Sequence, residues 1–246
     1  IKNYDTNIEI KGKFEITGEP KRITQNELKK EYFSLKNLDK YEIENNILLK
    51  ARGFNAEYIK AFRSSLKKDK YGNIAIPNYK IQEIQDSNGE IKETLDICGY
   101  TRRLNYPITK DKNGKELENP IKNLQNGLKG LEILTTHNKR EDLKNINRII
   151  ITESIIDSLS LGQMMDYNPH QTLFISTAGQ FNEQELQKAL CFMLKLMPKA
   201  NIILAFDNDQ RGREYQETLT NYFIKEHQKL TNSLKPFAKD CNDDLR

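Results

Sequence analysis

The stretch Arg148-Ile-Ile-Ile-Thr-Glu153-Ser-Ile-Ile-Asp157-Ser-Leu-Ser160 decides the fold of this 246-residue chain. Its β-branched run, Ile149–Thr152, is typical of a strand that is buried on both faces of a parallel sheet. The next segment, Ile155–Met165, spaces its apolar side chains as a helix does. A buried strand followed at once by a helix predicts a βα unit, and Glu153 stands where the strand ends.

The same alternation of strand and helix continues to the end of the chain. We expect further strands at Thr172–Ser176, Asn201–Phe206 and Ser233–Phe237, with helices from Asn182 to about Met197 and over Arg213–Lys229. This order predicts an α/β fold in which a mostly parallel four-stranded sheet is flanked by helices.

The residues before this region have a different pattern. Helical spacing over residues 41–50 and 55–66 is followed by expected strands over 73–77, 79–84 and 91–100. The pair Asn88-Gly89 is a strong hairpin signal, and Asn113-Gly114 marks a second turn. We therefore predict an N-terminal arm or linker at 1–38, a basic, smaller α+β subdomain at 39–147 and the α/β domain at 148–246.

Acidic residues stand at the ends of two of the expected parallel strands. Glu153 follows the first strand, and Asp207 and Asp209 follow the third. The carboxyl ends of parallel strands meet at one edge of a sheet, where ligands bind. A lone D-x-D sequence is more often a polar turn, but converging carboxylates repel each other unless a cation lies between them. Oxygen ligands of this kind suit Mg²⁺, so we expect a metal site at this edge.

Charge and cysteine content narrow the class of protein. Residues 1–147 hold 28 Lys and Arg against 22 Asp and Glu, whereas residues 148–246 hold 11 against 13. A basic half beside an acidic one is compatible with a nucleic-acid protein, although lysines also decorate ordinary solvated surfaces. The three cysteines, Cys98, Cys191 and Cys241, are too widely spaced for a disulfide framework or a zinc site, which favours a cytoplasmic location. No apolar run is long enough to cross a membrane.

Three motifs in the back of the chain resemble those of the Toprim family. Glu153-Ser-Ile-Ile-Asp157-Ser-Leu resembles the glutamate motif, usually E-G-x-x-D-x-L, with a serine in place of the glycine. Asp207-Asn-Asp-x-x-Gly212 resembles the D-x-D motif with its following glycine, and Lys239-Asp-Cys-Asn-Asp243 resembles the closing segment of primase-like members. Together these motifs cover about residues 148–245.

The front of the chain is similar to the core of bacterial-type primases. The similarity lies in Leu48–Phe62, in Asn73–Pro77, in Gly99-Tyr-Thr-Arg-Arg-Leu104 and, more loosely, in Asn126–Gly130. The resemblance runs from about residue 40 to the end. It is closest to the primase-like Toprim proteins associated with plasmid mobilisation and relaxases, and it implies a Toprim domain preceded by a primase-core-like subdomain.

The resemblance also implies the chemistry and the residues. Mg²⁺ or Mn²⁺ would support phosphoryl transfer on single-stranded DNA with nucleotides as partners. The catalytic, metal-binding carboxylates would be Glu153, Asp207 and Asp209. Glu153 would alternatively act as the general base. Asp157 and Asp240 would be second-metal or outer-shell residues. Candidate contacts to phosphate or template are Arg102, Arg103, Lys129 and Lys239.

Three functions stay open at this level. The first is a primase-like nucleotidyltransferase in plasmid or mobile-element replication or transfer, which the retained carboxylates favour. The second is a weakly catalytic or non-catalytic Toprim DNA-binding module within a relaxase or helicase polypeptide. It is favoured by Asn242, where replicative primases often carry an acid, by the lack of a zinc-binding domain and by the fragment-like start at Ile1. The third is a Toprim nuclease. A topoisomerase would need a strand-passage domain for which too few residues remain.

Overall fold

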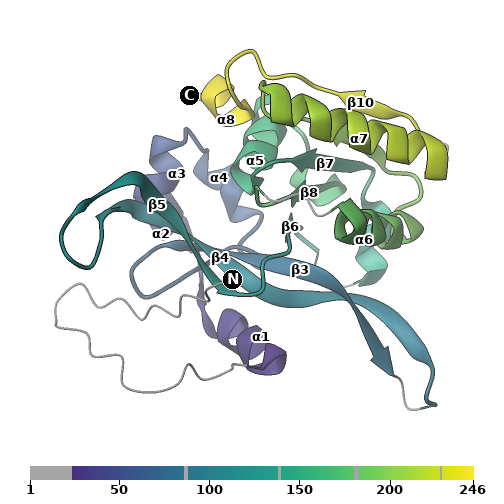
Figure 1. Ribbon diagram of the computed structural model, residues 1–246, viewed down its shortest axis with the longest axis horizontal. Helices are drawn as coiled ribbons and strands as arrows, with labels where there is room; N and C mark the ends of the chain where they lie inside the picture. Colours follow the sequence, from purple (N-terminus) through teal and green to yellow (C-terminus); the bar gives the residue numbers. More distant parts are fainter. Residues whose placement is uncertain (1–23, 86–87, 138–139, 180–182, 228) are drawn as a thin grey trace.

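The computed structural model describes residues 24–85, 88–137, 140–179, 183–227 and 229–246. Ten strands form one mixed sheet, and helices cover both of its faces (Figure 1). The main path through the sheet runs β1-β2-β3-β6-β8-β7-β9-β10, and β4 and β5 extend it from β3. We refer to residues 24–147 as the front half and to residues 148–246 as the back half.

The back half contains the four parallel strands that the sequence predicts. They are β7 (Arg148–Thr152), β8 (Thr172–Ser176), β9 (Asn201–Leu204) and β10 (Thr231–Ser233). They lie in the order β8-β7-β9-β10. The last strand begins and ends earlier than predicted. The four strands are also not a separate sheet, because β8 pairs with β6 of the front half in antiparallel fashion.

Four helices accompany these strands. They are α5 (Ile155–Met164), α6 (Glu183–Leu196), α7 (Gln210–His227) and α8 (Cys241–Leu245). The first three match the predicted helices to within a few residues, whereas α8 has no counterpart in the sequence-based prediction. A 3-10 turn, η2 (Pro169–Gln171), leads from α5 into β8.

Long antiparallel strands dominate the front half. They are β3 (Ile74–Gln85), β4 (Ile91–Lys110) and β5 (Glu116–Gly127), joined by hairpins at the two predicted Asn-Gly turns. The predicted strands at 73–77 and 79–84 are one continuous strand with a bulge at Asn78/Tyr79. The short strand β6 (Leu131–Leu134) was not predicted, yet it joins the two halves by pairing with β3 on one side and β8 on the other.

The helices of the front half are shorter than predicted. The segment 41–50 divides into α2 (Lys40–Asn45) and α3 (Ile47–Ala51), because the Asn46 side chain accepts from the Leu49 backbone N–H and starts a new helix. Helix α4 (Ala56–Lys60) is capped by Asn55 as predicted but gives way to turns before Leu66. The two-residue strand β2 (Lys67–Lys68) pairs with β3, and β1 (Lys36–Asn37) pairs with the other side of β2. The 3-10 turn η1 (Arg140–Asn145) precedes β7.

The predicted arm is partly within the described residues. Helix α1 (Gln25–Ser34) begins with a capping box formed by Thr24 and Glu27, and it lies against β4 at the base of the molecule in Figure 1. Leu28 and Tyr32 pack with Ala75, Ile97 and Tyr100 in a small apolar cluster. The residues before 24 lie outside the described part of the chain, and the domain boundaries stay a prediction.

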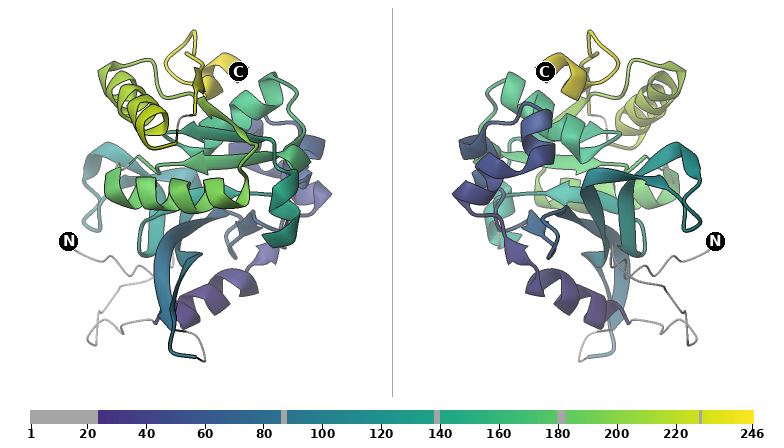
Figure 2. Two further views of the ribbon diagram at one scale, coloured as in Figure 1. Left: turned by 90° about the vertical axis from the view of Figure 1, so that its right-hand side faces the viewer. Right: turned by 90° about the vertical axis from the view of Figure 1, so that its left-hand side faces the viewer.

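Two larger apolar clusters sandwich the sheet. On one face Ile149 and Ile151 of β7 pack with α6 and α7, and on the other Ile150 packs with α5 and with α2 to α4. Figure 2 shows these two helical layers on opposite sides of the strands. Successive side chains of β7 point to opposite faces of the sheet, so this one strand packs against both helical layers. The carboxyl ends of the parallel strands lie between these layers, at one edge of the sheet. Among the described residues, no helix is long and apolar enough to cross a membrane.

Candidate functional site

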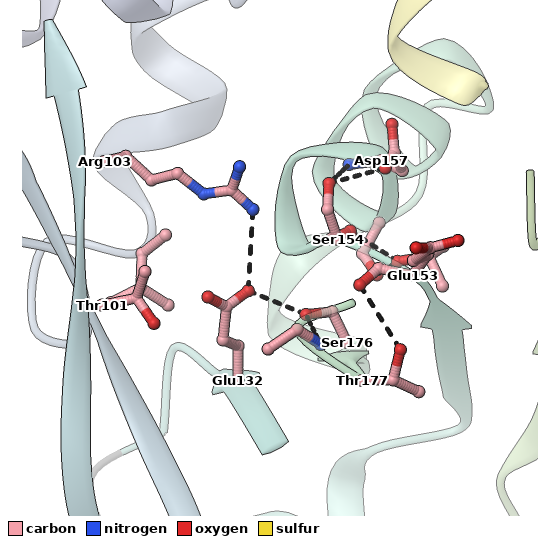
Figure 3. Close-up of polar contacts among 12 residues, drawn as sticks. Thr101, Arg103, Glu132, Glu153, Ser154, Asp157, Ser176 and Thr177 are labelled. Atoms are coloured by element: carbon pink, nitrogen blue, oxygen red, sulfur yellow. Dashed lines mark hydrogen bonds and ion pairs between the residues drawn. The ribbon is translucent and has the colours of Figure 1, made fainter. Parts of the chain in front are cut away.

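The carboxyl ends of β7 and β8 are joined by backbone hydrogen bonds. The Thr177 N–H donates to the Thr152 carbonyl at 3.1 Å, and the Gly179 N–H donates to the Glu153 carbonyl at 3.1 Å. The Thr177 hydroxyl lies 3.5 Å from the same Glu153 carbonyl (Figure 3). Ala178 and Gly179 both have positive φ, at 54° and 69°. This turn therefore fixes the backbone of Glu153, the first of the predicted carboxylates.

Asp157 is the most deeply placed of the five predicted carboxylates, with 6% of the residue exposed. It accepts from the Ser154 hydroxyl at 2.6 Å and from the Asn242 backbone N–H at 3.3 Å. Burial raises the pKa of Asp157 to about 6, and the nearby charge of Asp240 adds to the rise; the hydrogen bond from Ser154 opposes it. The serine that replaces the usual glycine of the motif is therefore the N-cap of α5 and holds this carboxylate.

Asp207 follows β9 and lies within reach of the other acids. Burial raises the pKa of Asp207 to about 7, and the charges of Asp157, Glu153 and Asp240 raise it further, while Lys239 opposes them. Each of the predicted metal residues except Asp209 thus takes part in one acidic group. None of the five carboxylates forms an ion pair within the described residues, so this negative charge is not neutralised by a paired side chain there.

Asp209 has a different environment from Asp207. Strand β9 ends at Leu204, two residues earlier than predicted, and residues 208–209 form a bend. One Asp209 oxygen accepts from the Gly212 N–H at 2.8 Å at the start of α7. Gly212 is required there, because a Cβ atom would lie 2.0 Å from the Asp207 carbonyl oxygen. Asp209 therefore caps a helix, whatever else it binds.

The closing segment is tied to both halves of the molecule. Asp240 caps α8 by accepting from the Asp243 N–H at 2.8 Å. The Asn242 amide is fully buried: it accepts from Arg52 Nη1 at 2.9 Å and donates at 2.9 Å to both the Arg52 carbonyl and the Ser160 hydroxyl. These contacts use both ends of an amide, which explains an asparagine here in structural terms.

The neighbouring arginines of β4 belong to different environments. Arg103 lies near the acidic group, where its charge lowers the pKa of Asp157, and its Nη2 is 4.0 Å from Glu132 (Figure 3). Arg102 points to the other face, as alternation along a strand requires, and pairs with buried Asp69 at 3.8 Å. Of the two predicted contacts, the structure brings only Arg103 to the carboxylates.

Lys129 lies half-buried between the basic and acidic residues. Burial lowers its pKa, Glu132 opposes that change, and Arg103 and Arg211 lower the pKa further. The backbone just after Lys129 is closely packed, because a Cβ atom on Gly130 would lie 2.4 Å from the Tyr79 carbonyl oxygen. A cavity of about 410 Å³ opens beside Lys129, bounded by Thr177 and by residues of β3 and α6. Lys239, the remaining predicted contact, is exposed beside Asp207.

Two charged residues of the site were missed by the sequence analysis. Arg211 follows the D-x-D motif, donates from Nη2 to the Gly179 carbonyl at 3.1 Å and lies near Glu153. Its place two residues after Asp209 was a usable signal. Glu132 lies on β6 with 1% of the residue exposed. An acid within the apolar run Leu131–Leu134 was also a signal, because a buried charge requires partners.

Comparison with known proteins identifies the back half. Residues 150–245 match the family model described as Toprim-like. None of the curated proteins compared with the chain matches it. Among solved structures, the RNA polymerase domain of Mycobacterium tuberculosis primase DnaG is similar in two forms. With double-stranded DNA it has 16% identity and a TM-score of 0.40, over 80% of this chain and 57% of that one. Without DNA it has 15% identity and a TM-score of 0.40, over 87% and 70%.

The donor set of the Toprim-like domain suits a hard divalent cation. Burial and the repulsion of neighbouring acids raise the pKa of Asp157 and of Asp207, and a bound cation would relieve that repulsion. Within the described residues, however, no group of three or more His, Cys, Asp or Glu side chains is arranged to hold an ion. Mg²⁺ needs no such cage, because it commonly takes one or two carboxylates, with water and substrate phosphate as its other ligands.

Proposed function

We propose that this chain is a metal-dependent nucleic-acid-processing protein that transfers nucleotides on a single-stranded DNA template, as a primase does. One observation carries the proposal: the carboxylates that follow the strand ends form no ion pair among the described residues, and Arg103 and Lys129 of the front half lie near them. Phosphoryl transfer uses this combination, because cations and basic side chains neutralise phosphates while carboxylates hold the cations.

Asp207 and Glu153 are the residues that would hold Mg²⁺, with Asp209 completing the set once substrate is bound. The ion supplies positive charge at the phosphates and lowers the pKa of a hydroxyl that it contacts. Asp157 is held by Ser154 and Asn242, so its role in the proposal is to add negative charge behind Asp207 and to stay outside direct coordination. Asp240 has a similar outer place as the cap of α8.

The basic residues have binding roles in the proposal. Arg103 and Lys129 lie on the front-half side of the carboxylates, and Arg211 and Lys239 on the back-half side. Phosphate groups bound between these two sides would be oriented toward Glu153 and Asp207. The cavity beside Lys129 and Thr177 has a volume suited to a nucleoside.

A DNA-binding module with little or no catalysis is the second candidate. It is favoured by the lack of a ready-made metal cage in the described residues and by the engagement of Asp157, Asp209 and Asp240 in helix caps. A plasmid-mobilisation setting, with relaxase or helicase domains in the same polypeptide, belongs to either candidate as a proposal.

The test incubates the chain with a single-stranded template, labelled nucleotides and Mg²⁺ or Mn²⁺. Wild type is compared with Asp207→Asn, which removes the charge but keeps the shape. Glu217→Gln is the control, because it also removes one carboxylate charge and Glu217 is exposed on α7, outside the three motifs. Primer synthesis by wild type and by the control, but not by Asp207→Asn, supports the proposal.

Other outcomes identify the alternatives. Template binding without synthesis in all three proteins supports the binding module. Metal-dependent cleavage of the template indicates a nuclease built on the same carboxylates. If neither the template nor the metal is bound, the proposed function is wrong.

A further inference from the structure

Buried Glu132 has no role in the proposed chemistry, although its place in the sheet is unusual. It lies on β6, the strand that joins the two halves, and its register partners are Asn78 on β3 and Ser176 on β8. Only 1% of the residue is exposed. A buried carboxylate costs several kcal/mol unless it is paired and hydrogen-bonded, so its partners indicate what it does.

The partners of Glu132 form a path across the junction (Figure 3). On the back-half side it accepts from the Ser176 hydroxyl at 2.7 Å, and that hydroxyl oxygen accepts from the Ala178 N–H at 3.2 Å. Ala178 belongs to the turn that fixes the Glu153 backbone. On the front-half side Glu132 lies 4.0 Å from Arg103 Nη2. A single carboxylate therefore connects an arginine of β4 with the loop beside the acidic group.

Arg103 is held but incompletely satisfied. Its side chain is 17% exposed, its ion pair with Glu132 is at the long end of the range, and its buried Nε has no hydrogen-bond partner among the described residues. A guanidinium in this state has donors left for a further anion, and phosphate accepts such donors in pairs. Glu132 supplies a fixed charge that keeps the arginine near the carboxylates without using up its donors.

We propose that Glu132 is a positioning residue that holds Arg103 in place to bind a phosphate group of the nucleic acid beside Glu153. This inference rests on the proposed function, since it concerns how that site binds its substrate. Ser176 orients Glu132 in turn. From charge alone, removing an acid near a phosphate site would strengthen nucleic-acid binding. Because Glu132 positions Arg103, removing the Glu132 charge is expected to weaken binding instead.

The test measures the affinity of the chain for a fluorescent single-stranded oligonucleotide over a series of salt concentrations. Glu132→Gln keeps the shape and the contact with Ser176 but removes the charge that holds Arg103. It is expected to weaken binding about five- to tenfold, as Arg103→Ala does. Both variants should reduce the salt dependence by about one phosphate contact. In the Arg103→Ala background, Glu132→Gln should cause no further loss.

Asp69→Asn is the matched control, because Asp69 is also buried and pairs with the adjacent Arg102 on the other face of β4. It should leave both the affinity and the salt dependence unchanged. Ser176→Ala is a second variant that touches neither arginine and should weaken binding to a smaller extent.

The outcomes separate this inference from the proposed function. If wild type binds and Arg103→Ala weakens binding while Glu132→Gln tightens it or leaves it unchanged, the positioning role is wrong and the proposed function stands. Equal losses from Glu132→Gln with and without Arg103 also overturn the positioning role, because the effect then does not act through the arginine. Absence of binding by wild type overturns both.

Discussion

The two halves of the sheet hold their charged residues in different ways. In the back half the carboxylates follow short parallel strands, and caps and turns of the same half hold most of them, as Ser154 holds Asp157. In the front half the arginines lie within a long antiparallel strand and are held by buried acids, Asp69 and Glu132. The acidic side of the site is therefore set by local loop geometry, whereas the arginines of β4 depend on ion pairs with residues far away in the sequence.

The largest expected effect comes from the centre of the acidic side. Asp207→Asn should reduce nucleotide transfer by roughly a hundredfold or more, because it removes a charged ligand of the proposed metal ion. Asp209→Asn should cost about tenfold or less, since an asparagine oxygen still caps α7. Steady-state rates at saturating Mg²⁺ measure both. Equal losses of rate in the two variants would contradict the assignment of metal binding mainly to Asp207 and of helix capping to Asp209.

The next effect concerns the segment that ties the two halves together. Asn242→Ala should lower the free energy of unfolding by about 2–3 kcal/mol, because the part-buried Arg52 carbonyl loses this donor and the buried Ser160 hydroxyl keeps only its bond to the Ile156 carbonyl. Urea denaturation measures the loss, with Asn232→Ala on an exposed stretch of β10 as the control. A loss no greater than that of the control would contradict the proposed link between α3, α5 and α8.

A smaller effect distinguishes the two arginines of β4. Arg103→Ala should weaken oligonucleotide binding about five- to tenfold, the loss of one charge-assisted phosphate contact. Arg102→Ala should change affinity less than about twofold but lower stability by about 1–3 kcal/mol, since it leaves buried Asp69 without its ion pair. Fluorescence anisotropy and thermal unfolding measure the two quantities. If Arg102→Ala weakened binding and Arg103→Ala lowered only stability, the phosphate contacts would lie on the other face of the sheet.

The smallest effect is a dependence on pH in the metal-free protein. The pKa of Asp207 is raised to about 7 from an ordinary value of 3.8, so the fold favours the protonated form. The stability that this provides is complete below about pH 4 and is lost as the pH rises through 7. Asp207→Asn, which cannot ionise, should therefore be more stable than wild type at pH 8, by about 1 kcal/mol at most after screening by solvent.

Thermal unfolding with and without Mg²⁺ checks this last prediction. Added Mg²⁺ should stabilise wild type at pH 8 and do so less at pH 6, and it should have little effect on Asp207→Asn. A wild-type protein that gains stability between pH 6 and 8 without metal would contradict the environment assigned to Asp207.

The sequence predicted the back half well because its signals are local. Runs such as Ile149–Thr152 are short, fully buried and followed by capped helices, so periodicity and capping suffice. The family model over residues 150–245 agrees with the Toprim resemblance read from the motifs. The roles of Glu153, Asp207 and Asp209 stay predictions, because the metal and the substrate that would define them come from outside the chain.

The front half was harder because its organisation is not local. Strand β6 is four residues long and entirely buried, so it has neither the alternation of an exposed strand nor the length of a helix. The expected strand at 91–100 stopped before the arginines, whereas β4 continues to Lys110. Alternation along that longer strand places Arg102 and Arg103 on opposite faces. Which of the two faces the carboxylates depends on how the strand pairs in the sheet, and the sequence pattern does not reveal that pairing.

The pairing of β6 with β8 carries the sheet across the predicted boundary at residue 148. A fragment starting at residue 148 would lose β6 and turn β8 into an open edge, with the backbone of Phe174, Ile175 and Ser176 free to pair. Unprotected apolar edges recruit other chains and aggregate. Residues of the front half therefore protect the sheet of the Toprim-like segment from pairing with other chains.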